Sequence, residues 1–327
     1  MLRSVAGLPL VERAVRALAT RVPRRRDILA VLTFHRVVAA DGVVPGLLSA
    51  TPEGFAAMLD IMMDAFTVIS IADVLARRDG GPPLPSRSLL LTFDDGYEDL
   101  ADHAWPALVA RGLPAIVFVP TAFPAGPGRP GAAFWWERLW AAIRDTPRDS
   151  VDIAGTALPV TTDRERTAAY RDARSWIKQL PHLDVEAAVG TVEAAAGFGP
   201  DNLPQPSGRP LDWDRLRALH AAGLALGSHT RTHPLLTRVD DETIRREIIG
   251  GVEDLQRETG THIPAFAFPS GALHGAAAPA LAEAGIHVAF STRRGVNDLG
   301  DAQWLELRRV NMSVTTPASA VLAQAVR

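Results

Sequence analysis

The chain has 327 residues, 47% of them hydrophobic, which is enough for one large α/β domain or two smaller ones; we expect the single domain. It contains no cysteine, which excludes disulfide bonds, thiolate metal sites and cysteine nucleophiles, so any metal ligands must be histidines or carboxylates. The formal net charge is −3, but residues 1–26 carry seven arginines against one glutamate, so the remaining residues carry −9. This distribution marks the N-terminus as a basic arm.

The basic arm, residues 1–27, has apolar residues at near-helical spacing with arginines between them. No uninterrupted apolar core precedes a small-residue cleavage site, so we expect no secretory signal, and no segment of the chain is long enough to span a bilayer. We expect an amphipathic helix that either packs on the domain or rests on an anionic membrane surface. These features predict a cytoplasmic protein, with peripheral contact to the inner membrane face in the second case, and no nucleic-acid partner.

The first third of the chain alternates strand-like and helix-like segments. Apolar runs bounded by turn-forming residues predict strands, and apolar residues at helical spacing predict helices. The expected strands span residues 28–34, 66–70, 88–94 and 115–119, and the expected helices span 51–63, 71–77 and 97–111.

Between about residues 123 and 210 this alternation breaks. A stretch rich in glycine and proline, residues 124–131, precedes an aromatic helix. Two weak strands at 151–153 and 157–160 follow, with helices near 163–179 and 184–196. We expect a helical insertion in which most aromatic side chains are buried, with room for one exposed ring on which a sugar stacks.

The alternation then resumes to the C-terminus. The expected helices span residues 211–219, 237–259 and 276–284, with a last one from about 317, and the expected strands span 225–229, 266–268, 288–290 and 307–310. About seven strands separated by helices predict a parallel α/β architecture. Because no glycine-rich phosphate loop follows any strand, a barrel is favoured over a nucleotide-binding fold.

Two adjacent carboxylates, Asp94 and Asp95, end the apolar strand that begins at Ser88 and directly precede Gly96. An Asp-Asp-Gly sequence on its own is often a solvated turn. At the end of a buried strand, however, two carboxylates repel each other and are costly to desolvate without a partner. A cation, a basic group or water must therefore meet them.

A second apolar run, which begins at Ala225, ends in His229 and His233. Pro234 disfavours helical geometry at His233, so we place the two histidines on a strand end and the turn after it. Two neutral imidazoles and one carboxylate hold a divalent cation and leave positions open for water and substrate, as in catalytic sites. Chemistry alone does not decide which aspartate is the ligand.

Residues 92–97 (Thr-Phe-Asp-Asp-Gly-Tyr) and 228–234 (Ser-His-Thr-Arg-Thr-His-Pro) resemble the first two motifs of the polysaccharide deacetylases, the NodB-homology or carbohydrate esterase family 4 enzymes. The resemblance extends to residues 34–37 (Phe-His-Arg-Val) and 266–271, and so covers most of the chain. The motif pattern is similar to that of the family branch that acts on poly-N-acetylglucosamine and related glycans. The resemblance implies a distorted (β/α)7 barrel with a helical insertion, and one catalytic domain over residues 28–327.

By this resemblance, Asp95, His229 and His233 bind a divalent metal ion, most commonly Zn²⁺, and Asp94 is the general base. The implied reaction removes N-acetyl groups from an amino-sugar glycan or glycan precursor and releases acetate. A carboxylate that is not a metal ligand can take a proton from water whose pKa the metal has lowered. The backbone N–H of Tyr97 would help to stabilise the oxyanion.

Two departures from the family pattern concern proton transfer. The usual third motif has an arginine and a tyrosine around a proline, whereas residues 268–271 read Phe-Pro-Ser-Gly. The usual last motif supplies a histidine as general acid, and residues 307–311 contain none. We expect His35 to act as the general acid, and Arg308 or Arg309 to orient the base.

The remaining histidines have no motif around them. His274 and His287 are reserve candidates for proton delivery, and His103, His182, His220 and His262, which fall in or beside predicted helices, are expected to be surface or packing residues.

Three alternatives share these residues. The altered third and last motifs permit a glycan-binding protein on the same fold. Two histidines and one carboxylate also make the iron site of some oxygenases. A base beside an open metal site favours hydrolysis over both. Within hydrolysis, a small lipid-linked or nucleotide-linked sugar is an alternative substrate to a glycan, and the sequence does not name the sugar, the acyl group or the oligomeric state.

Overall fold

The core of the protein is a closed barrel of parallel strands. The computed structural model describes residues 16, 22–23, 26–39, 42–126, 128–271 and 274–312. The barrel strands are β1 (Ile28–Phe34), β5 (Ser88–Asp94), β6 (Ile116–Val119), β9 (Ala225–Ser228), β10 (Ala265–Ala267), β11 (Val288–Arg294) and β13 (Leu307–Asn311). Their spatial order is β1-β13-β11-β10-β9-β6-β5, and the ring closes because β5 also pairs with β1. The predicted (β/α)7 barrel is confirmed.

The strand register brings the segments that carry the motifs to one rim. Phe34 at the end of β1 lies opposite Phe93 of β5, and Asp94 pairs in register with β6. Val119 of β6 pairs with Ser228, the last residue of β9. The residues that follow β1, β5 and β9 therefore emerge together at the carboxyl end of the barrel, where such barrels place their chemistry.

The continuous apolar strands are explained by burial on both faces. Leu29 and Val31 of β1 pack in one cluster with residues of β5, β6, β10 and β11, whereas Leu32 and Phe34 pack in another with helix α2 (Pro52–Ala65). Alternate residues of a strand point to opposite faces, so one set fills the barrel and the other meets the surrounding helices.

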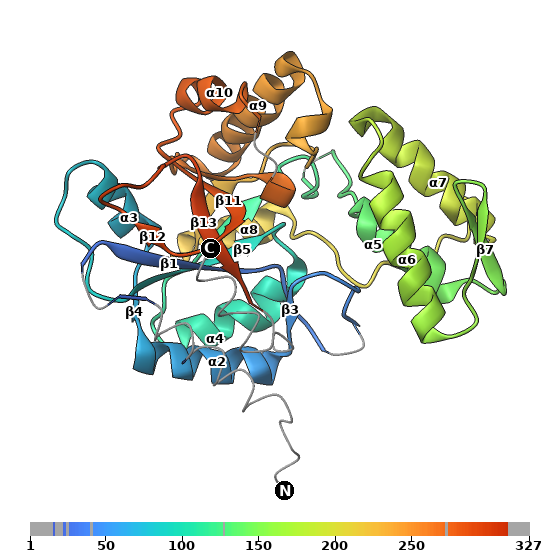
Figure 1. Ribbon diagram of the computed structural model, residues 1–327, viewed down its shortest axis with the longest axis horizontal. Coiled ribbons are helices and arrows are strands. Elements are labelled where there is room, and N and C mark those ends of the chain that lie inside the picture. The colour runs from blue at the N-terminus through green and yellow to red at the C-terminus, as the bar shows by residue number, and fades with distance from the viewer. Residues whose placement is uncertain are drawn as a thin grey trace, which may run out of the picture.

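Helices cover the outside of the barrel. They are α2, α3 (Ile71–Arg78), α4 (Trp105–Val109), α8 (Trp213–Ala221), α9 (Asp241–Thr259) and α10 (Ala277–Glu283). Helices α2 and α4 lie on one side of the barrel and α9 and α10 on the opposite side (Figure 1). The side chain of Thr51 accepts a hydrogen bond from the Gly54 N–H, and Pro52 is the first helical residue of α2, as the capping pattern predicts.

Two predicted elements have different bounds in the structure. The helix expected over residues 237–259 is divided into the 3₁₀ turn η4 (Leu236–Arg238) and α9, because the side chain of Asp240 caps α9. The strand expected over residues 66–70 is reduced to β4 (Thr67–Val68), which pairs with the start of β5 outside the closed ring.

The helix expected over residues 97–111 begins with the π-helical turn η2 (Leu100–Ala104) before α4. Pro106 lacks the N–H that would continue an α-helical hydrogen-bond ladder, which accounts for the irregular start. Three short strands were not predicted: β2 (Arg36–Val37), β3 (Ser49–Ala50) and β12 (Asn297–Asp298).

The segment between about residues 123 and 210 lies beside the barrel as a lobe of its own (Figure 1). It contains α5 (Trp135–Asp145), β7 (Ser150–Ile153), β8 (Thr156–Pro159), α6 (Asp163–Ile177), η3 (His182–Asp184) and α7 (Val185–Ala195). Leu139, Tyr170 and Val189 belong to an apolar cluster made largely by the lobe itself. We call this segment the insertion; the domain limits proposed from the sequence stay predictions.

Most of the basic arm and the helix expected from about residue 317 lie outside the described residues. Within the described part of the chain, no helix combines the length and the apolar character needed to cross a membrane.

Candidate metal centre and active site

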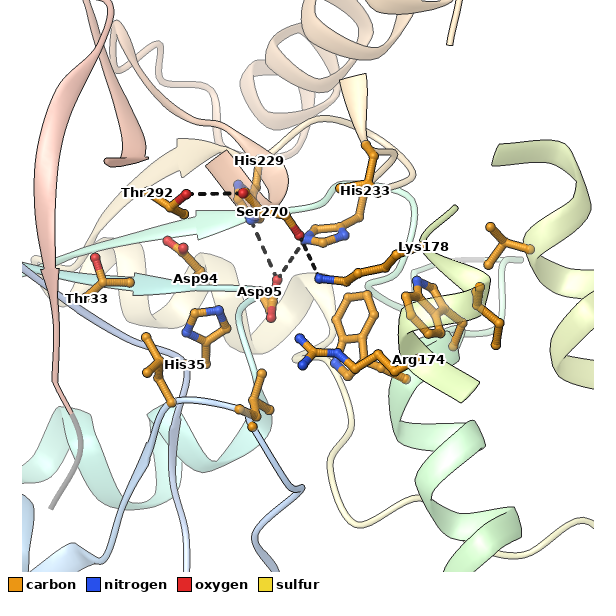
Figure 2. A pocket seen from close by; sticks show the side chains of 18 of the residues that line it. Thr33, His35, Asp94, Asp95, Arg174, Lys178, His229, His233, Ser270 and Thr292 are labelled. Atoms are coloured by element: carbon orange, nitrogen blue, oxygen red, sulfur yellow. Dashed lines mark hydrogen bonds and ion pairs between the residues drawn. The ribbon is translucent and has the colours of Figure 1, made fainter. Parts of the chain in front are cut away.

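Three of the predicted residues converge at the rim of the barrel. Asp95 follows β5, and His229 and His233 lie on the turn that follows β9. The Oδ1 atom of Asp95 is 3.7 Å from His229 Nε2 and 3.5 Å from His233 Nε2 (Figure 2). The three candidate ligand atoms all lie within 4.8 Å of one another.

This cluster fits a divalent metal ion. Ligand atoms bound to one zinc ion at about 2.0–2.1 Å lie about 3.4 Å apart in a tetrahedral arrangement, close to the two distances here. The buried Oδ1 of Asp95 has no hydrogen-bond partner in the described part of the chain. A buried, unpaired carboxylate oxygen between two imidazole nitrogens is costly unless a cation lies among them.

The protonation states also suit metal ligands. Burial lowers the pKa of His229 and lowers that of His233 well below its usual value, so both rings are neutral at pH 7. The ring Nδ1 of His229 lies 2.7 Å from the carbonyl oxygen of Ala267, which holds the tautomer that leaves Nε2 free. Burial and the neighbouring Asp94 raise the pKa of Asp95 well above its usual value, and a cation would oppose this shift.

Two of the three candidate ligands have an unusual backbone. Asp95 has a φ of 71° and His233 a φ of 58°, in the left-handed region that residues other than glycine seldom adopt. Such conformations cost on the order of 1–2 kcal/mol per residue. Strain of this kind gathers at functional sites, where the surrounding structure holds it in place.

Asp94 is held by an arginine from the far end of the chain. The Nη1 of Arg309, on β13, donates a 2.8 Å hydrogen bond to Asp94 Oδ1, and both side chains are buried. Burial would raise the pKa of Asp94, but the guanidinium of Arg309 outweighs this effect and lowers it, so the carboxylate stays ionised. Of the two arginines predicted to orient Asp94, the structure pairs it with Arg309.

His35 lies beside the two aspartates at the end of β1 (Figure 2). Its buried Nδ1 has no hydrogen-bond partner among the described residues. Burial lowers the pKa of His35 to about 4, against the opposing effect of Asp94, so the ring is neutral at pH 7. It can therefore deliver a proton as a cation only after it has gained one during the reaction.

The side chain of Tyr97 packs against the insertion. The phenol oxygen accepts a 2.7 Å hydrogen bond from Trp136 Nε1, and the ring packs on Phe134. The buried phenol is thus part of the contact with the insertion. The backbone N–H of Tyr97 remains the group predicted to stabilise an oxyanion.

Residues 175–289 match the family model for polysaccharide deacetylases, and this segment contains both His229 and His233. This part of the chain is similar to the polysaccharide deacetylase family. The chain is 26% identical over 255 residues to the poly-beta-1,6-N-acetyl-D-glucosamine N-deacetylase of Escherichia coli K12. This match covers 76% of the chain but only 31% of that relative. The chain therefore spans about a third of the length of the curated relatives it matches.

Solved structures support the fold of the barrel and the insertion. The Streptococcus pyogenes deacetylase PplD, in complex with acetate, has a TM-score of 0.58 at 15% identity; the match covers 92% of this chain and 99% of that one. IcaB from Ammonifex degensii has a TM-score of 0.56 at 19% identity, covering 91% of this chain and 98% of that one. Both matches extend over the barrel and show its fold.

The pocket at the rim of the barrel contains residues that were not predicted. A cavity of about 310 Å³ lies over the candidate metal ligands, and the insertion contributes Arg174 and Lys178 to its lining. His182, predicted to be a surface or packing residue, also lines it and bonds to Thr232 Oγ1 at 2.9 Å. Charged residues at helical spacing usually face solvent, so the sequence held no signal that these would face a pocket.

The remaining sequence candidates lie elsewhere. His274 is 3.7 Å from Asp241 and His287 is 3.7 Å from Asp79, and neither lines the pocket. His103, His220 and His262 also lie outside the lining, as expected. Of the insertion aromatics, Phe134 and Trp136 are buried, and Trp135 is partly exposed on the pocket wall.

Proposed function

We propose that the protein is a metal-dependent hydrolase that removes N-acetyl groups from an amino-sugar glycan or glycan precursor and releases acetate. The observation that carries the proposal is the pairing of two adjacent carboxylates with different environments. Asp95 lies between the neutral imidazoles of His229 and His233, and Arg309 keeps Asp94 ionised. A metal ligand and a separate base side by side suit hydrolysis, whereas binding alone needs no such base.

Asp95, His229 and His233 would hold the metal, and we propose Zn²⁺, which accepts two imidazoles and a carboxylate. Bound there, the ion would act as a Lewis acid on the acyl carbonyl and lower the pKa of a water molecule. The same three donors occur in iron oxygenases, so the metal found after purification tests the choice.

The protein residues would divide the proton transfers among them. Asp94 takes a proton from the attacking water, and Arg309 keeps this carboxylate ionised and oriented. The Tyr97 N–H stabilises the negative charge that develops on the carbonyl oxygen. His35, neutral at rest, takes over the proton that Asp94 gained from the water and passes it to the leaving amine.

The test is acetate release by zinc-loaded protein over a panel of N-acetylated oligosaccharides, nucleotide sugars and lipid-linked sugars. Asp94→Asn serves as the blank because the amide keeps the shape of the side chain but cannot act as a base. We expect release that the substitution abolishes. A fully active Asp94→Asn protein would contradict the assignment of the base, and zinc-loaded protein inactive on the whole panel would contradict the proposed reaction.

A further inference from the structure

The pocket over the candidate metal ligands carries more positive than negative charge. Among the described residues that line it, Arg174, Lys178, Arg238 and Arg309 are cationic and Asp94 and Asp95 are anionic. Arg309 is paired with Asp94, and a divalent cation would more than neutralise Asp95. The charges of Arg174, Lys178 and Arg238 are then left without a balancing carboxylate in the lining.

These three cations are available to a ligand. No carboxylate of the described chain lies in ion-pair distance of Arg174, and its buried Nε has no hydrogen-bond partner there. Lys178 Nζ contacts a neutral group, Ser270 Oγ, at 3.2 Å (Figure 2). Arg238 is exposed at the end of η4. A buried N–H without a partner is costly, and a ligand acceptor would remove that cost.

Arg174 and Lys178 face the pocket because they lie four residues apart, at the end of α6, on one face of the helix. They are also close together in space. Burial lowers the pKa of Lys178 to about 8, and the positive charge of Arg174 is the second cause of this shift. Ile177, between them in sequence, is buried in the core of the insertion and fixes the helix end.

The insertion is held against the rim at several points. Arg36, after β1, donates a hydrogen bond to Glu137 of α5 at 3.3 Å. Trp136 packs on His233 with ring centroids 4.8 Å apart. Together with the Lys178–Ser270 contact, these interactions hold the two cations of α6 over the candidate metal ligands, where they can contact a substrate during hydrolysis.

This charge is unfavourable for a partly deacetylated polymer. Each hydrolysed acetamide becomes an amine, which is protonated at neutral pH, so the pocket would repel the growing product. Arginine and lysine are the side chains that most often bind phosphate. The cavity of about 310 Å³ is at the lower end of the range for pockets that bind small ligands, so it suits a small substrate.

We propose that the substrate is a small N-acetylated amino sugar that carries a phosphate ester or diphosphate, and that Arg174 and Lys178 bind this phosphate while the acetamide lies at the metal site. This inference rests on the proposed function and names its substrate class. Arg238 adds a third positive charge at the pocket mouth. A free sugar phosphate, a nucleotide sugar and a lipid-linked sugar share this chemistry.

The first test measures binding without turnover. Calorimetry with zinc-loaded Asp94→Asn protein compares N-acetylglucosamine 1-phosphate with N-acetylglucosamine. We expect at least tenfold tighter binding of the phosphorylated sugar, because hydrogen bonds between charged groups are stronger than those between neutral groups. Arg174→Gln and Lys178→Gln, each added to Asp94→Asn, should remove most of this preference.

The matched control is Arg171→Gln in the same background. Arg171 is an exposed residue of α6 that does not line the pocket, so this variant loses the same charge from the same helix and should keep the preference. Equal affinity for the two sugars, or a preference that survives both pocket substitutions, would overturn the proposal. Melting curves confirm that the variants are folded.

The second test measures acetate release by zinc-loaded protein with Asp94 intact. N-acetylglucosamine 1-phosphate, UDP-N-acetylglucosamine and a polyprenyl diphosphate-linked N-acetylglucosamine are compared with neutral N-acetylglucosamine oligomers. The preferred phosphorylated substrate identifies the phosphate source. Efficient hydrolysis of the neutral oligomers alone would overturn the substrate class and leave the deacetylase function intact. Phosphate-dependent binding without acetate release from any substrate would contradict the function and retain the phosphate site.

Discussion

The barrel rim and the insertion meet at one pocket but contribute different groups. The rim supplies the candidate metal ligands and Asp94, all at or just after strand ends. The insertion supplies Arg174 and Lys178 from the end of a helix, together with the aromatic wall around Trp136. In the proposed reaction, the rim would perform the chemistry and the insertion would select the substrate on which the rim acts.

The two regions also differ in how they are held. At the rim, buried ion pairs and neutral imidazoles place each group, as in the 2.8 Å pair of Arg309 with Asp94. The insertion has its own apolar core and meets the rim through polar contacts such as those of Arg36 with Glu137 and of Lys178 with Ser270. Substitutions at the rim should therefore abolish turnover, and those in the insertion should mainly change substrate binding.

The largest expected effects on turnover come from substitutions of Asp94 and His229 at the rim. Asp94→Asn should lower kcat by about 10²- to 10⁴-fold, the usual contribution of a general base, and should retain the metal. His229→Ala should lose both the metal and activity, because it removes a ligand. Metal analysis and acetate release on the same samples separate the two; loss of metal in Asp94→Asn would exchange the roles given to Asp94 and Asp95.

The next effect concerns the arginine that holds the base. Arg309→Met leaves the Asp94 carboxylate buried without its partner, which should destabilise the fold by about 3–5 kcal/mol or leave Asp94 protonated and inactive as a base. Denaturant unfolding and kcat measure the two outcomes. Arg293→Met is the control, since that arginine is exposed and its ion pair with Glu306 should contribute no more than about 1 kcal/mol. Unchanged kcat and stability in Arg309→Met would show that the pair does not position the base.

A smaller effect is expected where the insertion contacts the rim. Glu137→Ala removes the buried partner of Arg36 and should lower the free energy of unfolding by about 3 kcal/mol. Because Trp136 beside it packs on His233, kcat/KM should fall by about 10- to 100-fold. Glu186→Ala removes an exposed carboxylate of the same lobe, paired with Arg138, and should change neither quantity much. Equal effects of the two substitutions would indicate that the rim does not depend on this contact.

The smallest effect concerns the basic arm, which lies mostly outside the described residues. If residues 1–27 rest on an anionic membrane face, the full chain should float with anionic liposomes and a chain without the arm should not, with little change in acetate release. Flotation that is equally poor for both proteins would remove the support for membrane contact and, with it, for a place at the inner membrane face.

The sequence alone predicts the position of a site residue when that residue lies at the end of a strand. The alternation of apolar runs and helices predicts the barrel, because strands buried on both faces must be apolar throughout. The motif residues Asp95, His229 and His233 directly follow such strands, so their meeting at one rim could be predicted as well.

Only the tertiary structure decided which of the two predicted arginines pairs with Asp94 and which residues of the insertion reach the pocket. Arg309 lies 215 residues from Asp94 in the chain, and β1, which pairs with both β13 and β5, brings the two residues together. Arg174 and Lys178 lie in a charged helix whose pattern is the same whether one face meets solvent or a pocket. Their position depends on how the insertion packs on the rim, and no local pattern of residues encodes a contact between segments so far apart.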